Sequence, residues 1–255
     1  MFQNYFIKFT RSKKPMKNNF FYSKLYFLIS IILLSQSIQS QQDLTDTRKM
    51  DAMTDLKNRK ARKADTPKDI KGTYYFNKNF QLSRIVYFGE ELKEKAYLRY
   101  NAANDEIEMG NSSTQKDAEE ILLKSAKVHA IIDNEEYRLL PHRLNETNYP
   151  VIGYLVVLVD NPKHSLYIKR TKVFMKAVEA RTSLDRSFPA RFVDEISYYF
   201  SSKGDTPIPL KTNKSSIIKI SGENGSKVRG YIKENEIKTK SLEGLVKIFD
   251  YINSL

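Results

Sequence analysis

Short apolar and aromatic runs alternate with turn residues from Gly72 onward, a pattern that is typical of β-strands. Asp133–Glu136 and Asp160–Lys163 carry the turn residues expected between hairpin strands. Because no helical run separates these strands, the pattern predicts an α+β, mainly β fold: an antiparallel meander forming an open curved sheet or a partly closed barrel. The nine predicted strands are 72–76, 84–88, 95–100, 105–109, 127–132, 136–140, 151–159, 165–174 and 190–200.

The pattern becomes helical after Thr212. Three short helices are predicted, over 214–221, 225–237 and 241–255, and Ser241 stands where its side chain can cap the last of them. Five apolar residues fall on one face of that helix: Leu242, Leu245, Val246, Phe249 and Ile252. We therefore expect two parts, an antiparallel β domain over 72–212 and a helical segment over 213–255. Because a short amphipathic helix is marginally stable alone, we expect the helical segment to dock on the sheet.

The N-terminus has the three parts of a secretory signal peptide. Residues 1–24 carry six basic residues and no acid, and the apolar run "LYFLISIILL" follows at 25–34 before a small, polar stretch. A membrane-spanning helix needs about 20 apolar residues, so this ten-residue run is too short for one. We therefore expect residues 1–40 to be removed on export. The cleavage site follows either Ser40 or Ser37, and translation starts at either Met1 or Met16; the sequence leaves both choices open.

Removal of this segment changes the charge of the chain. The whole sequence has a net charge of +13, of which residues 1–40 carry +6, leaving +7 over residues 41–255. This spread excess suits contact with an anionic surface as well as simple solubility, and export argues against nucleic acid as the partner. Residues 41–71 include the basic stretch "LKNRKARK" at 56–63 and read as a charged linker or frayed helix, either solvated or acting as an anion-binding arm.

The sequence contains no cysteine. An exported protein without disulfides is held together by its core, and about 215 residues are enough to bury one. The absence also excludes thiol nucleophiles and cysteine metal sites. His129, His142 and His164 are not spaced as ligands on one local element, so we predict neither a metal site nor a cofactor.

The stretch "LRYNAANDEIEM", residues 98–109, places an arginine before a polar turn and three carboxylates after it. If residues 101–104 form the turn, Arg99 lies opposite Glu106 with Glu108 beside it. This register predicts that the apolar residues face the core and that the charged pair faces solvent. Asp105 sits where aspartate bonds to a turn backbone. A hairpin charge pair is favoured over a metal or acid–base site.

Asp194 is the candidate binding residue. In the strand 190–200 it shares one face with apolar residues, which makes it either a buried acid of raised pKa lining a pocket or a residue with a structural role. The structural alternatives are a β-bulge at Asp194 and Glu195, or an ion pair with Arg191 or Arg181. No catalytic residue is assigned, because no catalytic motif is present.

Four stretches resemble an uncharacterised family of secreted, β-rich proteins from Bacteroidota: "GTYYFNKNF" (72–80), "YLRYNAANDEIEM" (97–109), "PARFVDEISYYF" (189–200) and "YIKENEIKTKSLEGLVKIFDYINSL" (231–255). The family usually has a proline where Tyr74 stands. The resemblance implies an exported, mostly β domain with a helical tail. It implies no catalytic residue, since the family has no known activity.

These observations favour a non-enzymatic binding or assembly module of the cell envelope, periplasmic or associated with the outer surface. Its expected partner is an envelope protein or a lipid, with no transmembrane helix in the processed chain. One alternative is a periplasmic carrier of an apolar ligand such as a lipid, since the chain has 16 tyrosines and 14 phenylalanines. A weaker alternative is a hydrolase of envelope polymers that uses Asp194.

Overall fold

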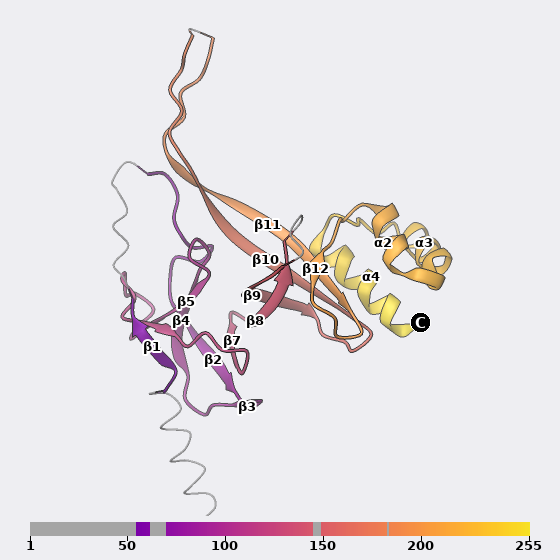
Figure 1. The fold of residues 1–255 in the computed structure, drawn as a ribbon, viewed down its shortest axis with the longest axis horizontal. Helices are drawn as coiled ribbons and strands as arrows, with labels where there is room; N and C mark the ends of the chain where they lie inside the picture. Colours follow the sequence, from indigo (N-terminus) through magenta and orange to yellow (C-terminus); the bar gives the residue numbers. More distant parts are fainter. Residues whose placement is uncertain (1–54, 62–69, 145–148, 183) are drawn as a thin grey trace, which may run out of the picture. The chain divides into compact units, whose positions relative to one another are not determined.

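A computed structural model of the protein describes residues 55–61, 70–144, 149–182 and 184–255 (Figure 1). All of these belong to the unit formed by residues 51–255. The predicted signal peptide and most of the predicted linker lie outside the described residues. The fold is mainly β: an antiparallel sheet that curls into a half-barrel, followed by three C-terminal helices, which confirms the predicted fold class.

The strands join in the order β1-β6-β5-β4-β2-β7-β8-β9-β10-β11-β12, and the two-residue β3 pairs with β2. Their bounds are Lys57–Lys60 (β1), Gln81–Tyr87 (β2), Glu90–Glu91 (β3), Ala96–Asn101 (β4), Glu106–Gly110 (β5), Glu120–Leu122 (β6), Val128–Ile132 (β7), Glu135–Arg143 (β8), Pro150–Val159 (β9), His164–Met175 (β10), Arg191–Ser202 (β11) and Ile208–Pro209 (β12). Residues 81–83 of β2 pair with β4, and residues 84–87 pair with β7. One strand thus joins the meander β7–β12 to the part of the sheet that precedes it.

Eight of the nine predicted strands coincide with observed ones. The prediction for 72–76 was wrong, because Tyr75 makes only an isolated bridge to Asn101. The hydroxyl oxygen of Thr73 accepts a hydrogen bond from the Tyr75 amide at 2.9 Å. This local turn competes with strand pairing for the same backbone group.

Strand β1 corrects the prediction of a linker or frayed helix over residues 57–60. These residues pair with β6, and the fully buried Leu56 precedes them. The carbonyl of Leu56 accepts a hydrogen bond of 2.7 Å from the Leu123 amide. The charged sequence therefore forms a strand because β6 offers an unpaired edge and the core has room for one leucine.

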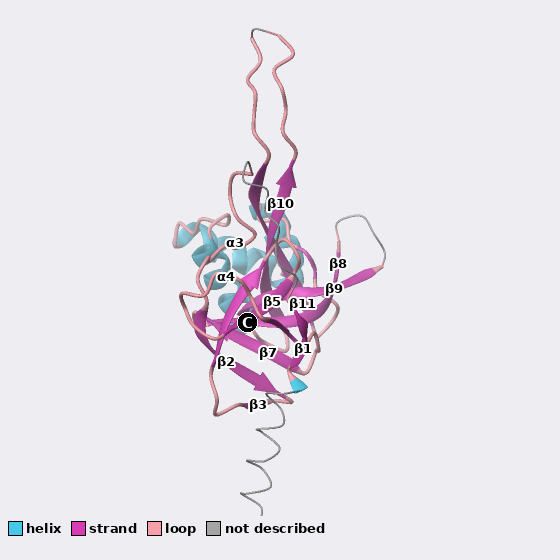
Figure 2. Ribbon diagram, turned by 90° about the vertical axis from the view of Figure 1, so that its left-hand side faces the viewer, coloured by secondary structure: helices cyan, strands magenta, loops and turns pink. Residues whose placement is uncertain are grey.

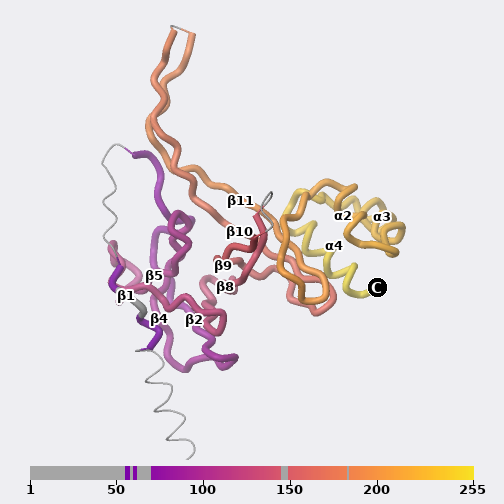
Figure 3. Tube along the Cα trace, in the orientation of Figure 1, coloured from indigo at the N-terminus to yellow at the C-terminus, as the bar shows by residue number. Residues whose placement is uncertain are grey.

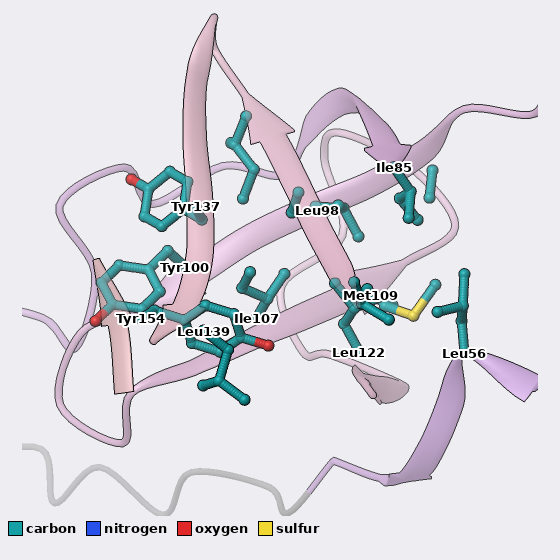
Figure 4. Packing of buried hydrophobic residues seen from close by; sticks show 14 of the residues in the cluster. Leu56, Ile85, Leu98, Tyr100, Ile107, Met109, Leu122, Tyr137, Leu139 and Tyr154 are labelled. Atoms are coloured by element: carbon teal, nitrogen blue, oxygen red, sulfur yellow. The ribbon is translucent and has the colours of Figure 1, made fainter. Parts of the chain in front are cut away.

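The main core lies between strands from both parts of the sheet (Figure 4). In β7 the alternation is regular, with Val128, Ala130 and Ile132 buried and the residues between them partly exposed. Tyr100, Tyr137 and Tyr154 pack in the same cluster, with Tyr100 and Tyr137 ring centroids 5.0 Å apart. Further members are Leu56, Ile85, Leu98, Ile107, Met109, Leu122 and Leu139.

The helices form a second core with the sheet (Figure 2). They are α2 (Lys214–Ile220), a 3-10 turn η1 (Gly222–Asn224), α3 (Gly225–Glu234) and α4 (Leu242–Ser254). The predicted cap is confirmed, since the Ser241 hydroxyl oxygen accepts a hydrogen bond from the Gly244 amide at 3.1 Å. The buried face of α4 differs from the prediction, because Ile248 is fully buried whereas Leu242 is exposed and Val246 is only partly buried. Val159 of β9 and Leu166 of β10 contact this helical cluster.

Candidate functional site

The hairpin of β4 and β5 has a register two residues away from the predicted one. Its turn comprises residues 102–105, and Arg99 therefore lies opposite Glu108, not Glu106. The side-chain oxygen of Asn101 accepts hydrogen bonds of 3.2 Å from two amides in this turn. A shift of two residues leaves every side chain on its predicted face but gives Arg99 a different partner.

The Arg99–Glu108 pair is buried, which corrects the expectation that it faces solvent. Only 4% of Arg99 and 6% of Glu108 is exposed, and their closest N–O distance is 2.7 Å. The Arg99 guanidinium lies between the rings of Tyr75, at 3.8 Å, and Phe80, at 4.1 Å. Loop residues from outside the hairpin therefore cover the face that an isolated two-stranded hairpin would expose to solvent.

Hydrogen bonds satisfy this buried pair from several sides. Arg99 donates to the carbonyls of Lys78 at 2.7 Å and Lys116 at 3.2 Å. Glu108 accepts from the Tyr75 hydroxyl and from the Asn101 amide group. Both buried charges are therefore compensated, and each Glu108 oxygen already accepts two hydrogen bonds.

Asp105 links the same turn to strands β9 and β10. Its carboxylate lies 2.6 Å from the ammonium group of Lys169 and accepts hydrogen bonds from the Tyr100 hydroxyl, at 2.6 Å, and the Tyr154 amide. Gly153 makes this approach possible, because a Cβ atom there would stand 2.4 Å from an Asp105 oxygen. The predicted turn bonding of Asp105 is thus replaced by long-range contacts.

His142 completes this polar cluster. It is 2% exposed, and its Nδ1 lies 3.1 Å from the carbonyl of Leu140. Burial lowers the pKa of His142 and also that of Lys169, although Asp105 opposes the shift for the lysine. Burial and the Asp105 carboxylate raise the pKa of Tyr100, which keeps this hydroxyl a donor. Lys169 and Tyr100 both bond to Asp105 and to backbone carbonyls, and His142 lies against the Leu140 carbonyl, an arrangement suited to joining strands.

Asp194 does not line a pocket as a buried acid. Its side chain is 54% exposed and forms an ion pair with Lys172 on the neighbouring strand. The predicted bulge is not present, since β10 and β11 pair without interruption from His164 and Ser202 to Met175 and Arg191. The structural interpretation holds for Asp194, but with a lysine partner instead of Arg191 or Arg181.

The described residues contain no group of three or more histidine and acidic side chains that could hold a metal ion. His129 lies 3.0 Å from a Glu136 oxygen, in a cluster that also includes Arg138. No helix in the described part of the chain combines the length and apolar character needed to cross a membrane.

The hairpin of β10 and β11 exposes the apolar surface that sequence reasoning missed. We call residues 174–182 and 184–192 the β10–β11 arm; its two sides run together beyond the strands, as Figures 1 and 3 show. Every described residue from Phe174 to Pro189 is exposed. Large apolar residues among them are Phe174, Met175, Val178, Leu184 and Phe188. The available signal was a long connection between two strands that still carried apolar residues.

Leu184, near the tip of the arm, is 93% exposed. Val178 and Phe188 hold the two sides together through a pair of backbone hydrogen bonds of 2.8 Å. Apolar side chains displayed together on a projecting element are typical of a binding surface. The arm is therefore a candidate surface for contact with another molecule.

Comparison with known proteins finds no match for this chain: no protein-family model, no curated protein and no solved structure.

Proposed function

We propose that this protein is an exported, non-enzymatic binding or assembly module of the cell envelope, periplasmic or surface-associated, which contacts its partner through the β10–β11 arm. The observation that carries the proposal is the apolar surface of the arm, where Val178, Leu184 and Phe188 are exposed to water. Such a surface lowers solubility unless a partner covers it. The signal peptide predicted over residues 1–40 supports an envelope location.

The packed core supports this proposal over a carrier of an apolar ligand. The tyrosines that could line a ligand cavity, Tyr100, Tyr137 and Tyr154, are instead buried against aliphatic side chains. A surface cleft of about 390 Å³ beside α4 is lined by charged groups that include Glu243 and Lys247, and one of about 570 Å³ beside β12 mixes apolar residues with Lys211 and Thr212. Ligand cavities for lipids are mostly apolar, so the cleft beside α4 is poorly suited to one and the cleft beside β12 is only partly suited.

The hydrolase alternative receives less support. It needs two carboxylates that converge on a cleft, with pKa values pushed apart. Asp194 has Lys172 as its partner instead, and both carboxylates of the polar clusters, Asp105 and Glu108, bond to buried groups. Their arrangement favours a structural role for these acids.

Photocrosslinking in the native cell envelope tests the proposal. A photoreactive residue is placed at Leu184 in the arm or, as the control, at Leu242, an exposed leucine on α4. We expect adducts from position 184 and few from position 242. Equal labelling at both positions, or none at 184, would contradict a role for the arm.

The same sample tests export. The processed protein should begin at residue 41 or residue 38, corresponding to cleavage after Ser40 or Ser37. An N-terminus before residue 25 would contradict the signal peptide and with it the envelope location.

A further inference from the structure

We infer that the β10–β11 arm binds the surface of an anionic lipid bilayer, with its apolar side chains inserted at the boundary between headgroups and acyl chains. The inference rests on the proposed function of the arm and names the chemistry of its partner. Three features of the arm carry it: the distribution of apolar side chains, the neighbouring cations that pair with no described residue, and the backbone bonding.

Apolar side chains lie on both faces of the hairpin ribbon. Phe174 on one face and Met175 on the other are each more than 40% exposed, whereas Phe192, the cross-strand neighbour of Phe174, is partly covered by Tyr74. Val193, directly after the arm, shares the face of Met175 and is also exposed. A single protein surface would cover one face of such a ribbon. A surrounding apolar medium covers both, which favours lipid.

The arm also carries more cations than anions. Glu179 and Asp185 are its acids, against four basic residues: Lys176, Arg181, Arg186 and Arg191. Three of these cations, Lys176, Arg181 and Arg186, have no ion pair with any described residue, although they lie beside Val178 and Leu184 in sequence. Basic residues next to exposed apolar ones are typical of segments that bind anionic membrane surfaces.

The backbone limits how deeply the arm can insert. The ladder of hydrogen bonds between β10 and β11 ends at Met175. Beyond it, among the described residues, Val178 and Phe188 exchange one further pair of backbone hydrogen bonds. Backbone groups without partners cannot enter the hydrocarbon interior, because water is not available to them there. We therefore expect interfacial insertion of Leu184, with the nearby arginines bound to lipid phosphates.

Vesicle flotation with the complete processed protein, residues 41–255, tests the inference. The probes are vesicles of phosphatidylethanolamine and phosphatidylglycerol at 3:1, and matched vesicles with phosphatidylcholine in place of phosphatidylglycerol. We expect binding to the anionic vesicles only, weakened by high salt. Leu184→Asp should bind at least about tenfold more weakly, since it removes apolar contact and adds an anion.

A charge variant separates the two contributions. Arg181→Gln combined with Arg186→Gln should weaken binding about 25-fold, or about fivefold for each cation lost. The control pair, Lys227→Gln with Arg229→Gln, removes two exposed cations from α3 and should change binding less than about twofold. Circular dichroism should show an unchanged fold for all variants, because every substituted residue is exposed.

Equal binding to both kinds of vesicle, or an equal loss in the control pair, would overturn the inference. Absence of vesicle binding together with a protein adduct at position 184 would overturn the lipid partner while leaving the binding module in place. Absence of both vesicle binding and any adduct would overturn both proposals.

Discussion

The buried Arg99–Glu108 pair makes Glu108→Gln the most informative stability test. Glu108 accepts four hydrogen bonds, from two Arg99 nitrogens, the Tyr75 hydroxyl and the Asn101 amide group. A glutamine has the same shape, but it lacks the charge and turns one acceptor into a donor. Two of these donors would then face an NH₂ group, and the Arg99 cation would stay buried without a counter-charge.

The expected cost follows from burial. Removing one partner of a buried ion pair costs about 3 to 5 kcal/mol, because the remaining charge is left uncompensated. The control Glu91→Gln breaks a 2.9 Å pair with Arg84 in which both side chains are more than 40% exposed. Solvent screens such a pair, so its loss should cost less than about 1 kcal/mol.

Urea unfolding followed by circular dichroism measures both variants. A stability loss for Glu108→Gln within about 1 kcal/mol, at an unchanged m-value, would refute the argument from burial. The double variant Arg99→Met with Glu108→Leu should be less destabilised than Glu108→Gln, because it leaves no unpaired charge. It should not reach wild-type stability, since the carbonyls of Lys78 and Lys116 lose their donor.

Three further predictions concern Gly153, His142 and Asp194. Gly153→Ala should cost about 1 to 3 kcal/mol in urea unfolding, because its methyl group displaces Asp105 from Lys169; an unchanged midpoint would contradict this packing. His142 has a lowered pKa in the folded protein, so the unfolded chain takes up this proton at a higher pH than the folded protein does. Stability should therefore fall as the pH drops below about 6.5, by at most about 1.4 kcal/mol per pH unit. His142→Gln should flatten that slope in unfolding curves measured between pH 7 and pH 5, and a retained slope would assign it to another group. Asp194→Asn should change stability by less than about 1 kcal/mol and leave vesicle binding intact, because the Asp194 side chain is half exposed. A larger effect in either assay would indicate a functional role for Asp194.

Local patterns in the sequence were enough to place most of the secondary structure. The Asp133 and Asn134 turn adopts the left-handed conformation that a tight hairpin requires, and Ser241 caps α4 as predicted. The alternation of buried residues in β7 could likewise be read directly. These features depend on neighbours a few residues away, so periodicity and residue type determine them.

Long-range contacts decided what the sequence left open. Whether Arg99 faces water depends on Tyr75 and Phe80, which come from a loop before β2. Residues 57–60 became a strand because β6, distant in the chain, offered them an edge. Apolar residues of the β10–β11 arm look like core residues in the sequence, and only the fold leaves them uncovered. Burial is set by which surfaces meet in space, and that information lies in the tertiary structure.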